Sequence, residues 1–178
     1  PSYEEYLLLN EGKTGFKIHL QTMIRKIIEG FCLKRSRLVV VLSRYMKNKV
    51  ESLYKISSDQ IIVNPGGVDL NRFYSHKNRE KLKLELRFPT GRVNLLTVRN
   101  LEKRMGIDNL IKCISILKEK MPDVFLTIGG SGEEKDRLES QIYENNLQEY
   151  ITMTGYIPDE FLPEYYAAAD FFIIPTRE

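Results

Sequence analysis

The sequence has few of the features that mark specialised classes of protein. Only two of its 178 residues are cysteine, Cys32 and Cys113, and neither has a Cys or His nearby at the spacing of a metal site. Both lie in apolar patterns, so we expect buried thiols in a reducing compartment, with no disulfide framework and no metal. No apolar run approaches the ~20 residues that cross a bilayer, and residues 1–5 do not resemble a signal peptide. We therefore expect a cytoplasmic protein.

Charge of either sign is not in large excess. The chain has 27 Lys and Arg against 24 Asp and Glu, a formal net charge of +3. A nucleic-acid-binding protein would need a larger surplus gathered on one face, so we expect no nucleic-acid partner.

What is present is ordinary globular material, with 42% hydrophobic and 29% charged residues, enough for one domain or parts of two. The chain does not begin with Met, and it ends on the buried-strand pattern Asp170–Ile174 with no helix to cover its second face. We therefore expect a fragment of a longer protein.

The first part of the sequence predicts two helices and two strands. Apolar residues recur at helical spacing from Phe16 to Cys32, which predicts an amphipathic helix with one buried stripe. The apolar run Leu38–Leu42 predicts a strand covered on both faces, and Ser43 is a candidate N-cap for a second helix. A short strand is predicted at Gln60–Val63.

A turn rich in proline and glycine, Asn64–Asp69, separates this part from the rest. We place a domain junction near it, with residues 1–75 on one side and residues 76–178 on the other. Residues 76–91 predict a short basic helix that ends at a Pro-Thr-Gly stop signal.

Beyond this point strands and helices alternate. The predicted strands are 93–98, 124–128, 150–154 and 170–174, and the predicted helices are 107–120, 134–145 and 163–169. Such alternation is typical of a parallel sheet with right-handed crossovers and helices on both faces. The predicted fold class is α/β.

Two loops stand out at the carboxyl ends of the predicted strands, where open parallel sheets bind ligands. The first is Arg99–Gly106, which carries Arg99, Lys103 and Arg104 just before a helix. Arginine keeps its charge and grips two phosphate oxygens at once, which favours a phosphate site for Arg104 over a solvated cluster. Lys103 alone also fits a solvated surface residue.

The second loop is Gly129–Gly132. Gly130 and Gly132 match the first two glycines of a dinucleotide fingerprint, but Lys135 occupies the third position. The loop is therefore either a tight strand-to-helix turn or a place where a ligand approaches closely. A third loop, Gly155–Pro158, offers an aromatic ring and main-chain groups that suit a nucleotide base.

Several motifs in series resemble glycosyltransferase family 4, whose two-domain fold is called GT-B. The stretch Ile61–Phe73 resembles the family's crossing from acceptor to donor domain, and Leu96–Leu101 with Arg104–Gly106 resembles its phosphate loop. Three further stretches resemble successive landmarks of the donor domain: Leu126–Gly132, Gly155–Pro158 and Tyr166–Asp170. The resemblance covers nearly the whole chain and implies Rossmann-like parallel sheets. Residues 1–75 would end the N-terminal acceptor-side domain, and residues 76–178 would begin the C-terminal donor-binding domain.

The resemblance implies a retaining transfer of a sugar from a nucleoside diphosphate sugar, with no metal ion and no other cofactor. The implied acceptor is a carbohydrate, a lipid-linked molecule or a small molecule, and peripheral membrane contact through the acceptor domain is allowed. Cations placed in advance would stabilise the negative charge that grows on the departing diphosphate. The implied site residues are Arg99, Lys103 and Arg104 for the diphosphate, Gly130, Ser131 and Gly132 for the donor-binding loop, and Tyr156 and Ile157 for the base.

The chain departs from the family pattern at Asn100, where many members have Arg, and at Met105, where many have Lys before the Gly. The catalytic residues are unknown, because the family's two Glu separated by seven residues should begin at or just after Glu178. We therefore expect the isolated chain to transfer no sugar. Two alternatives stay open: a non-catalytic module that binds a nucleotide or sugar phosphate, and an NAD-dependent enzyme indicated by the glycine loop alone.

Overall fold

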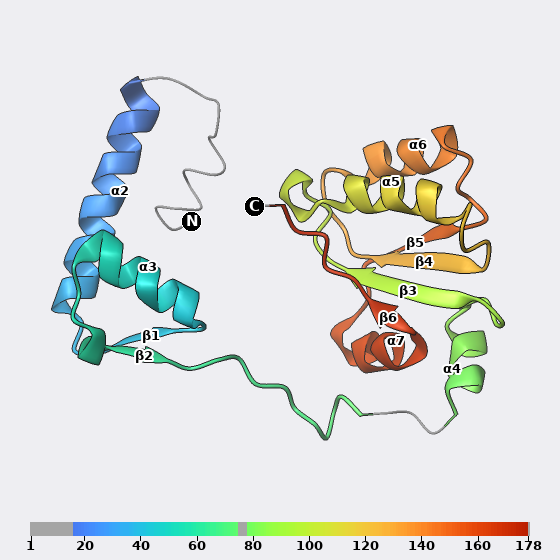
Figure 1. Ribbon diagram of the computed structural model, residues 1–178, viewed down its shortest axis with the longest axis horizontal. Helices are drawn as coiled ribbons and strands as arrows, with labels where there is room; N and C mark the ends of the chain where they lie inside the picture. The colour runs from blue at the N-terminus through green and yellow to red at the C-terminus, as the bar shows by residue number, and fades with distance from the viewer. Residues whose placement is uncertain (1–15, 75–77, 178) are drawn as a thin grey trace. The chain divides into compact units, whose positions relative to one another are not determined.

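A computed structural model of the chain describes residues 16–74 and 78–177. The chain divides into two compact units, Pro1–Val68 and Asp69–Glu178, which are the blue-to-green and green-to-red parts of Figure 1. The division comes a few residues before the boundary that the sequence predicts after residue 75. Residues 76 and 77 of the predicted basic helix, and Glu178 at the predicted acidic motif, lie outside the described residues.

The first unit is a small α/β arrangement of helix α2 (Phe16–Arg35), strand β1 (Val39–Val41), helix α3 (Arg44–Tyr54), the 3-10 turn η1 (Ser58–Gln60) and strand β2 (Ile61–Val63). The two strands pair in parallel, with Val39 opposite Ile61. Ser43 caps α3 as predicted, because its hydroxyl accepts the main-chain N–H of Met46 at 3.2 Å. Apolar side chains from β1, α3 and β2 form the core of this unit.

Burial in the first unit differs from the prediction. Strand β1 is covered on one face only, since Val39 and Val41 are buried while Val40 is 56% exposed. Six apolar residues of α2 are between 44% and 60% exposed, so the predicted buried stripe is wrong for the described side chains; they are Leu20, Met23, Ile24, Ile27, Ile28 and Phe31. The physical reason is area: two strands of 3 residues cannot cover a helix of 20.

Both cysteines are exposed, which contradicts the predicted buried thiols. Cys113 lies on helix α5 (Ile107–Leu117), whose buried side is formed by Leu110, Ile111 and Ile114. Cys32 shares the uncovered surface of α2. An apolar sequence pattern locates a helix face, but the packing partners decide which face is buried.

The second unit contains a four-stranded parallel sheet. It comprises helix α4 (Arg79–Glu85), strand β3 (Val93–Val98), the 3-10 turn η2 (Lys103–Met105), helix α5, strand β4 (Val124–Gly129), helix α6 (Lys135–Glu144), strand β5 (Ile151–Gly155), the 3-10 turn η3 (Asp159–Phe161), helix α7 (Leu162–Ala168) and strand β6 (Phe171–Phe172). The strand order is β5-β4-β3-β6. Every predicted element of this unit is found, and β3 has the predicted bounds.

Helices cover both faces of this sheet, as Figure 1 shows with α5 and α6 on one side and α4 and α7 on the other. Successive residues of β3 point into the two layers: Leu95 belongs to the core with α5 and α6, and Leu96 packs with Leu82, Phe88 and Ala168. The predicted α/β fold with Rossmann-like parallel sheets is confirmed.

Strand β6 is shorter and more exposed than predicted. It has two residues in place of the expected five, and Phe171 and Phe172 are 61% and 40% exposed. Among the described strands β6 pairs with β3 only and lies at the sheet edge, so its second side has no neighbour there to bury it.

Candidate functional site

The cavity best placed for chemistry lies at the carboxyl ends of β3, β4 and β5. Its volume is about 420 Å³, and the loops that follow these three strands supply most of its wall. Ligands of open parallel sheets bind at this edge because the loops converge there. The lining residues are Val98, Arg99, Asn100, Met105, Gly130, Ser131, Tyr156, Ile157, Asp159 and Leu162.

Main-chain hydrogen bonds hold the three loops together. The N–H of Leu101 donates to the carbonyl of Ser131 at 2.9 Å, and the N–H of Glu134 donates back to the carbonyl of Leu101 at 3.0 Å. The N–H of Gly130 donates to the carbonyl of Gly155 at 2.7 Å. The loops after β3, β4 and β5 therefore form one connected wall.

The glycine loop allows this close approach of main chain to main chain. A Cβ at Gly130, where φ is +133°, would overlap the carbonyl oxygen of Arg99. A Cβ at Gly132 would overlap the carbonyl oxygen of Leu101. The main chain of the loop after β3 thus occupies the space where side chains at Gly130 and Gly132 would lie, which fits a tight strand-to-helix turn. Gly130 and Ser131 nevertheless line the cavity.

Arg99 is the predicted diphosphate residue that lines the cavity. Its guanidinium Nη2 donates to the sulfur of Met105 at 2.8 Å, and Met105 is itself buried and lines the same cavity. The thioether is neutral, so the contact orients the guanidinium without cancelling its charge.

The other two predicted cations do not line the cavity. Lys103 and Arg104 lie in η2, and Arg104 is about half-exposed, with its Nε 2.9 Å from Glu102 Oε2. The structure therefore brings together Arg99, the glycine loop and the loop after β5, but not Lys103, Arg104 or Gly132.

The predicted base-binding residues lie on the opposite side of the glycine loop. Ile157 is 5% exposed and packs on Gly129, where a Cβ would overlap its Cδ1. Tyr156 is 71% exposed. In the described part of the chain, the main-chain N–H groups of Tyr156 and Ile157 donate to no main-chain carbonyl.

Sequence reasoning did not assign a role to two further lining residues, Asp159 and Leu162. Asp159 directly follows the loop Gly155–Pro158, and its place beside a predicted ligand-binding loop could have indicated that it lines the site. The Arg72 guanidinium lies 2.7 Å from Asp159 Oδ2, and this hydrogen bond lowers the pKa of the carboxyl below its ordinary value.

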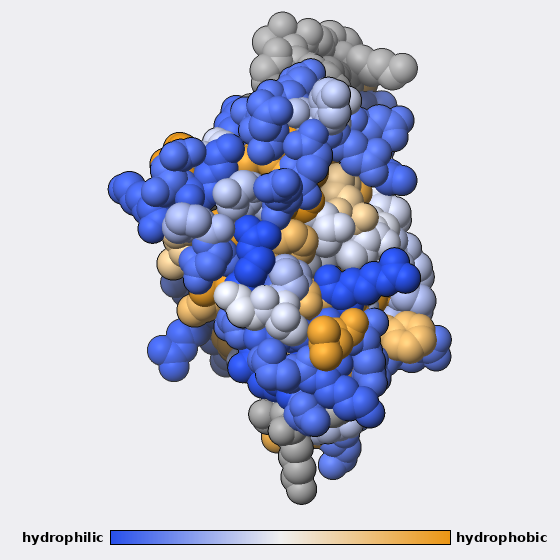
Figure 2. All heavy atoms as spheres, turned by 90° about the vertical axis from the view of Figure 1, so that its right-hand side faces the viewer, coloured by the Kyte–Doolittle hydropathy of each residue, from blue (hydrophilic) through white to orange (hydrophobic). Residues whose placement is uncertain are grey.

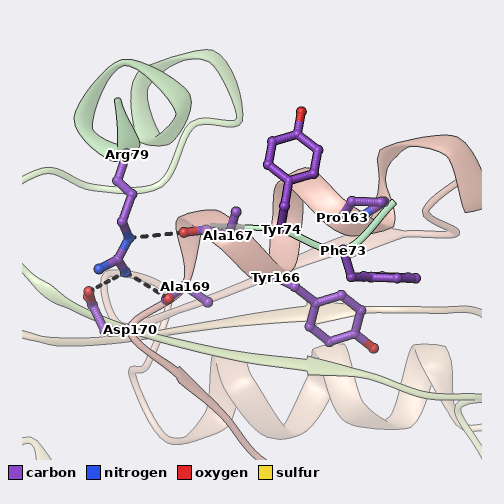
Figure 3. A pocket seen from close by; sticks show the side chains of 8 residues that line it. All are labelled: Phe73, Tyr74, Arg79, Pro163, Tyr166, Ala167, Ala169 and Asp170. Carbon is purple, nitrogen blue, oxygen red and sulfur yellow. Dashed lines mark hydrogen bonds and ion pairs between the residues drawn. The ribbon is translucent and has the colours of Figure 1, made fainter. Parts of the chain in front are cut away.

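A second cavity of about 380 Å³ lies beside α4 and α7 and is lined partly by aromatic rings (Figure 3). Its arginine, Arg79, bonds to other residues of the cavity wall. Arg79 donates to the carbonyls of Ala167 at 3.0 Å and Ala169 at 2.8 Å and to Asp170 Oδ1 at 2.9 Å. These bonds join α4 to the end of α7, so the polar groups that form them stabilise the fold. This second cavity is therefore a weaker candidate for a ligand site than the cavity at the carboxyl ends of the strands.

The amino-terminal edge of the sheet presents a mostly hydrophilic surface. This side of the second unit faces the viewer in Figure 2 and is mainly hydrophilic, with apolar side chains in small separate patches.

In the described residues, no group of three or more His, Cys, Asp and Glu side chains could hold a metal ion. Nor does any helix of residues 16–74 and 78–177 combine the length and apolar character needed to span a membrane.

The sequence matches one family model and is similar to glycosyltransferases and synthases of known name. Residues 78–178, more than half of the chain, match the family model described as glycosyl transferases group 1. The chain is 30% identical over 132 residues to mannosylfructose-phosphate synthase of Agrobacterium fabrum, covering 70% of the chain and 29% of that protein. It is 30% identical over 140 residues to the GDP-mannose-dependent alpha-(1-6)-phosphatidylinositol monomannoside mannosyltransferase of Mycolicibacterium smegmatis, covering 78% and 36%.

Among solved structures, HepE of Anabaena in complex with UDP has a similar fold. The TM-score is 0.75 at 19% identity, over 87% of this chain and 43% of that one. The chain spans about a third of the length of the two relatives named above.

Proposed function

Because the chain belongs to the group 1 glycosyl transferases, we propose that it is part of an enzyme that transfers a sugar from a nucleoside diphosphate sugar to an acceptor. The carrying observation is the cavity that joins Arg99, the glycine loop and the loop after β5 at the carboxyl edge of the sheet. One relative is named as GDP-mannose-dependent and one similar fold contains UDP, which supports a nucleoside diphosphate as the ligand.

Arg99 is the first residue of the proposed diphosphate site. Negative charge grows on the diphosphate as the glycosidic bond breaks, and a cation already in place stabilises it without reorganisation. Lys103 and Arg104 from η2 add to this charge when their side chains turn to the ligand, which for Arg104 requires leaving Glu102. In this proposal side-chain cations do the work that a metal ion does elsewhere.

The base of the nucleotide lies against the loop after β5. The main-chain N–H groups of Tyr156 and Ile157 read its edge, and the exposed Tyr156 ring offers an apolar face for stacking. Ser131 and the glycine loop form the wall between the base and the diphosphate.

The remaining parts of the proposal concern the longer protein. Residues 1–75 form the end of the acceptor-side domain and residues 76–178 the first part of the donor domain. Transfer is retaining and takes place in the cytoplasm, and the acceptor is a carbohydrate, lipid-linked or small molecule. The acceptor domain is the part for which we propose peripheral membrane contact. The acidic residues that complete catalysis lie at or beyond Glu178, so the isolated chain transfers no sugar, and turnover by it would contradict this part.

Calorimetric titration of the chain with UDP, GDP and NAD tests the donor site. We expect a nucleoside diphosphate to bind and Arg99→Ala to weaken it about 10- to 100-fold, since a charge-assisted hydrogen bond contributes about 1.5–3 kcal/mol. Lys135→Ala is the control, because Lys135 forms an exposed pair with Glu139 on α6. Binding of NAD with no binding of UDP or GDP would replace the proposal with the nicotinamide alternative.

A further inference from the structure

The segment after β6 returns to the loop that follows β3. Figure 1 shows the end of the chain beside the turn that precedes α5. The main-chain N–H of Arg177 donates to the carbonyl of Arg104 at 3.1 Å, and its guanidinium Nη1 donates to the carbonyl of Lys103 at 2.7 Å. Arg177 therefore binds two successive carbonyls of η2 across more than 70 residues of sequence.

The other end of the guanidinium is anchored on helix α5. Arg177 Nη2 lies 2.5 Å from Asp108 Oδ2 and 3.4 Å from Asn109 Oδ1. Asp108 is buried, and burial alone would raise the pKa of its carboxyl. The hydrogen bond and charge of Arg177 outweigh that effect and, with a smaller contribution from Arg137 at 4.0 Å, lower the pKa of Asp108.

The two segments also pack without room for a side chain between them. Gly106, which joins η2 to α5, has φ of +70°, and a Cβ there would overlap the carbonyl oxygen of Pro175. A glycine at this position thus permits both the left-handed turn and the close approach of residues 175–177.

The turn held in this way leads directly to the cavity. Its last residue is Met105, which lines the cavity and accepts the hydrogen bond from Arg99. We propose that Arg177 is a positioning residue of the nucleotide site: anchored on Asp108, it fixes η2 so that Met105 holds Arg99 toward the diphosphate. The inference rests on the proposed function, because the diphosphate is the ligand proposed there.

Two measurements on the 178-residue chain test this role. Amide hydrogen exchange at Met105 and Gly106 reports on the turn, because these N–H groups donate to the carbonyls of Glu102 and Lys103. Titration with UDP and GDP reports on the site. For Arg177→Ala we expect exchange at both amides to rise about tenfold and nucleotide binding to weaken about tenfold, as for loss of one charge-assisted hydrogen bond.

Conservative variants separate positioning from general destabilisation. Arg177→Lys keeps the charge but cannot reach Asp108 and the Lys103 carbonyl with one planar fork, so we expect intermediate affinity. Asp108→Asn keeps an oxygen that accepts from Arg177 and should lose less affinity than Arg177→Ala. Lys135→Ala is the control and should change neither readout.

The possible results distinguish this inference from the proposed function. Unchanged exchange in Arg177→Ala, or faster exchange with unchanged nucleotide affinity, overturns the positioning role. A wild-type chain that binds neither UDP nor GDP contradicts the proposed function, and the exchange data then decide on their own whether Arg177 holds the turn.

Discussion

Arg99 and Arg104 differ in what their guanidinium groups touch. Arg99 has no carboxylate within ion-pair distance among the described residues, and its hydrogen bond goes to the neutral sulfur of Met105. Arg104 already pairs with Glu102. A cation that is not neutralised attracts an anion more strongly than a paired one, so Arg99 is the stronger candidate for the diphosphate.

Asp170 shows how one carboxylate joins several elements. It accepts the main-chain N–H of Asn94 at 2.9 Å and lies 2.9 Å from Arg79 Nη2 and 3.6 Å from Lys83 Nζ. Burial alone would raise the pKa of Asp170, but the Asn94 N–H and the charges of Lys83 and Arg79 outweigh it and lower the pKa. The ionised carboxylate therefore stabilises the fold above its ordinary pKa, and this contribution is lost as pH falls through the folded value.

We expect Asp170→Asn to lower the free energy of unfolding by about 2 kcal/mol at pH 7, the scale of a hydrogen-bonded charge. Because the wild-type chain itself loses this contribution on protonation, the difference between the two should shrink below about pH 4. Urea unfolding at pH 7, 5 and 3 measures it, with Asp136→Asn on the exposed side of α6 as control. A difference that stays constant down to pH 3 would contradict the assignment.

At the scale of elements, Arg92 joins the amino ends of the three long strands. Its guanidinium donates to the carbonyl of Glu149 at 2.6 Å and to the carbonyl of Val124 at 2.8 Å. It also lies over the rings of Phe125 and Tyr150, with 5.2 and 5.1 Å to their centroids. A planar guanidinium can stack and donate in several directions at once, so it fits this position better than an ammonium.

Arg92→Lys should therefore cost about 2 kcal/mol of the free energy of unfolding although it keeps the charge. Circular dichroism during urea unfolding provides the measurement. Arg87→Lys, at an exposed arginine of the same unit, is the matched control and should change stability little. Equal effects of the two substitutions would argue against the role of Arg92.

At the scale of the whole molecule, helix α2 of the first unit carries a row of exposed apolar side chains. Leu20, Ile24, Ile27, Ile28 and Phe31 recur at helical spacing and are all exposed. Contiguous apolar surface of this kind marks a place where other surfaces bind. Single exposed apolar residues, such as Ile116 on α5, carry no such implication.

The chain should therefore bind a dye specific for exposed apolar surface, and the double substitution Ile24→Gln with Ile28→Gln should reduce the fluorescence at least about twofold. The comparison variant is Ile116→Gln, which removes an exposed apolar side chain outside the patch. If both variants lower the signal equally, α2 is not the binding surface.

The sequence by itself determined the kind and order of the elements. Strand β3 has the predicted bounds, Ser43 caps α3, and the loops after β3, β4 and β5 meet in one cavity. These features follow from local periodicity, capping and the geometry of a parallel sheet, which a short stretch of sequence contains.

The tertiary structure alone decided which candidates meet and what is buried. It placed Arg99 but not Arg104 in the cavity, filled the space beside Gly130 with the Arg99 main chain, and left Cys32 exposed. It also brought Arg177 to Asp108. Such contacts depend on residues far apart in the chain, and no local pattern specifies which of them will pack together.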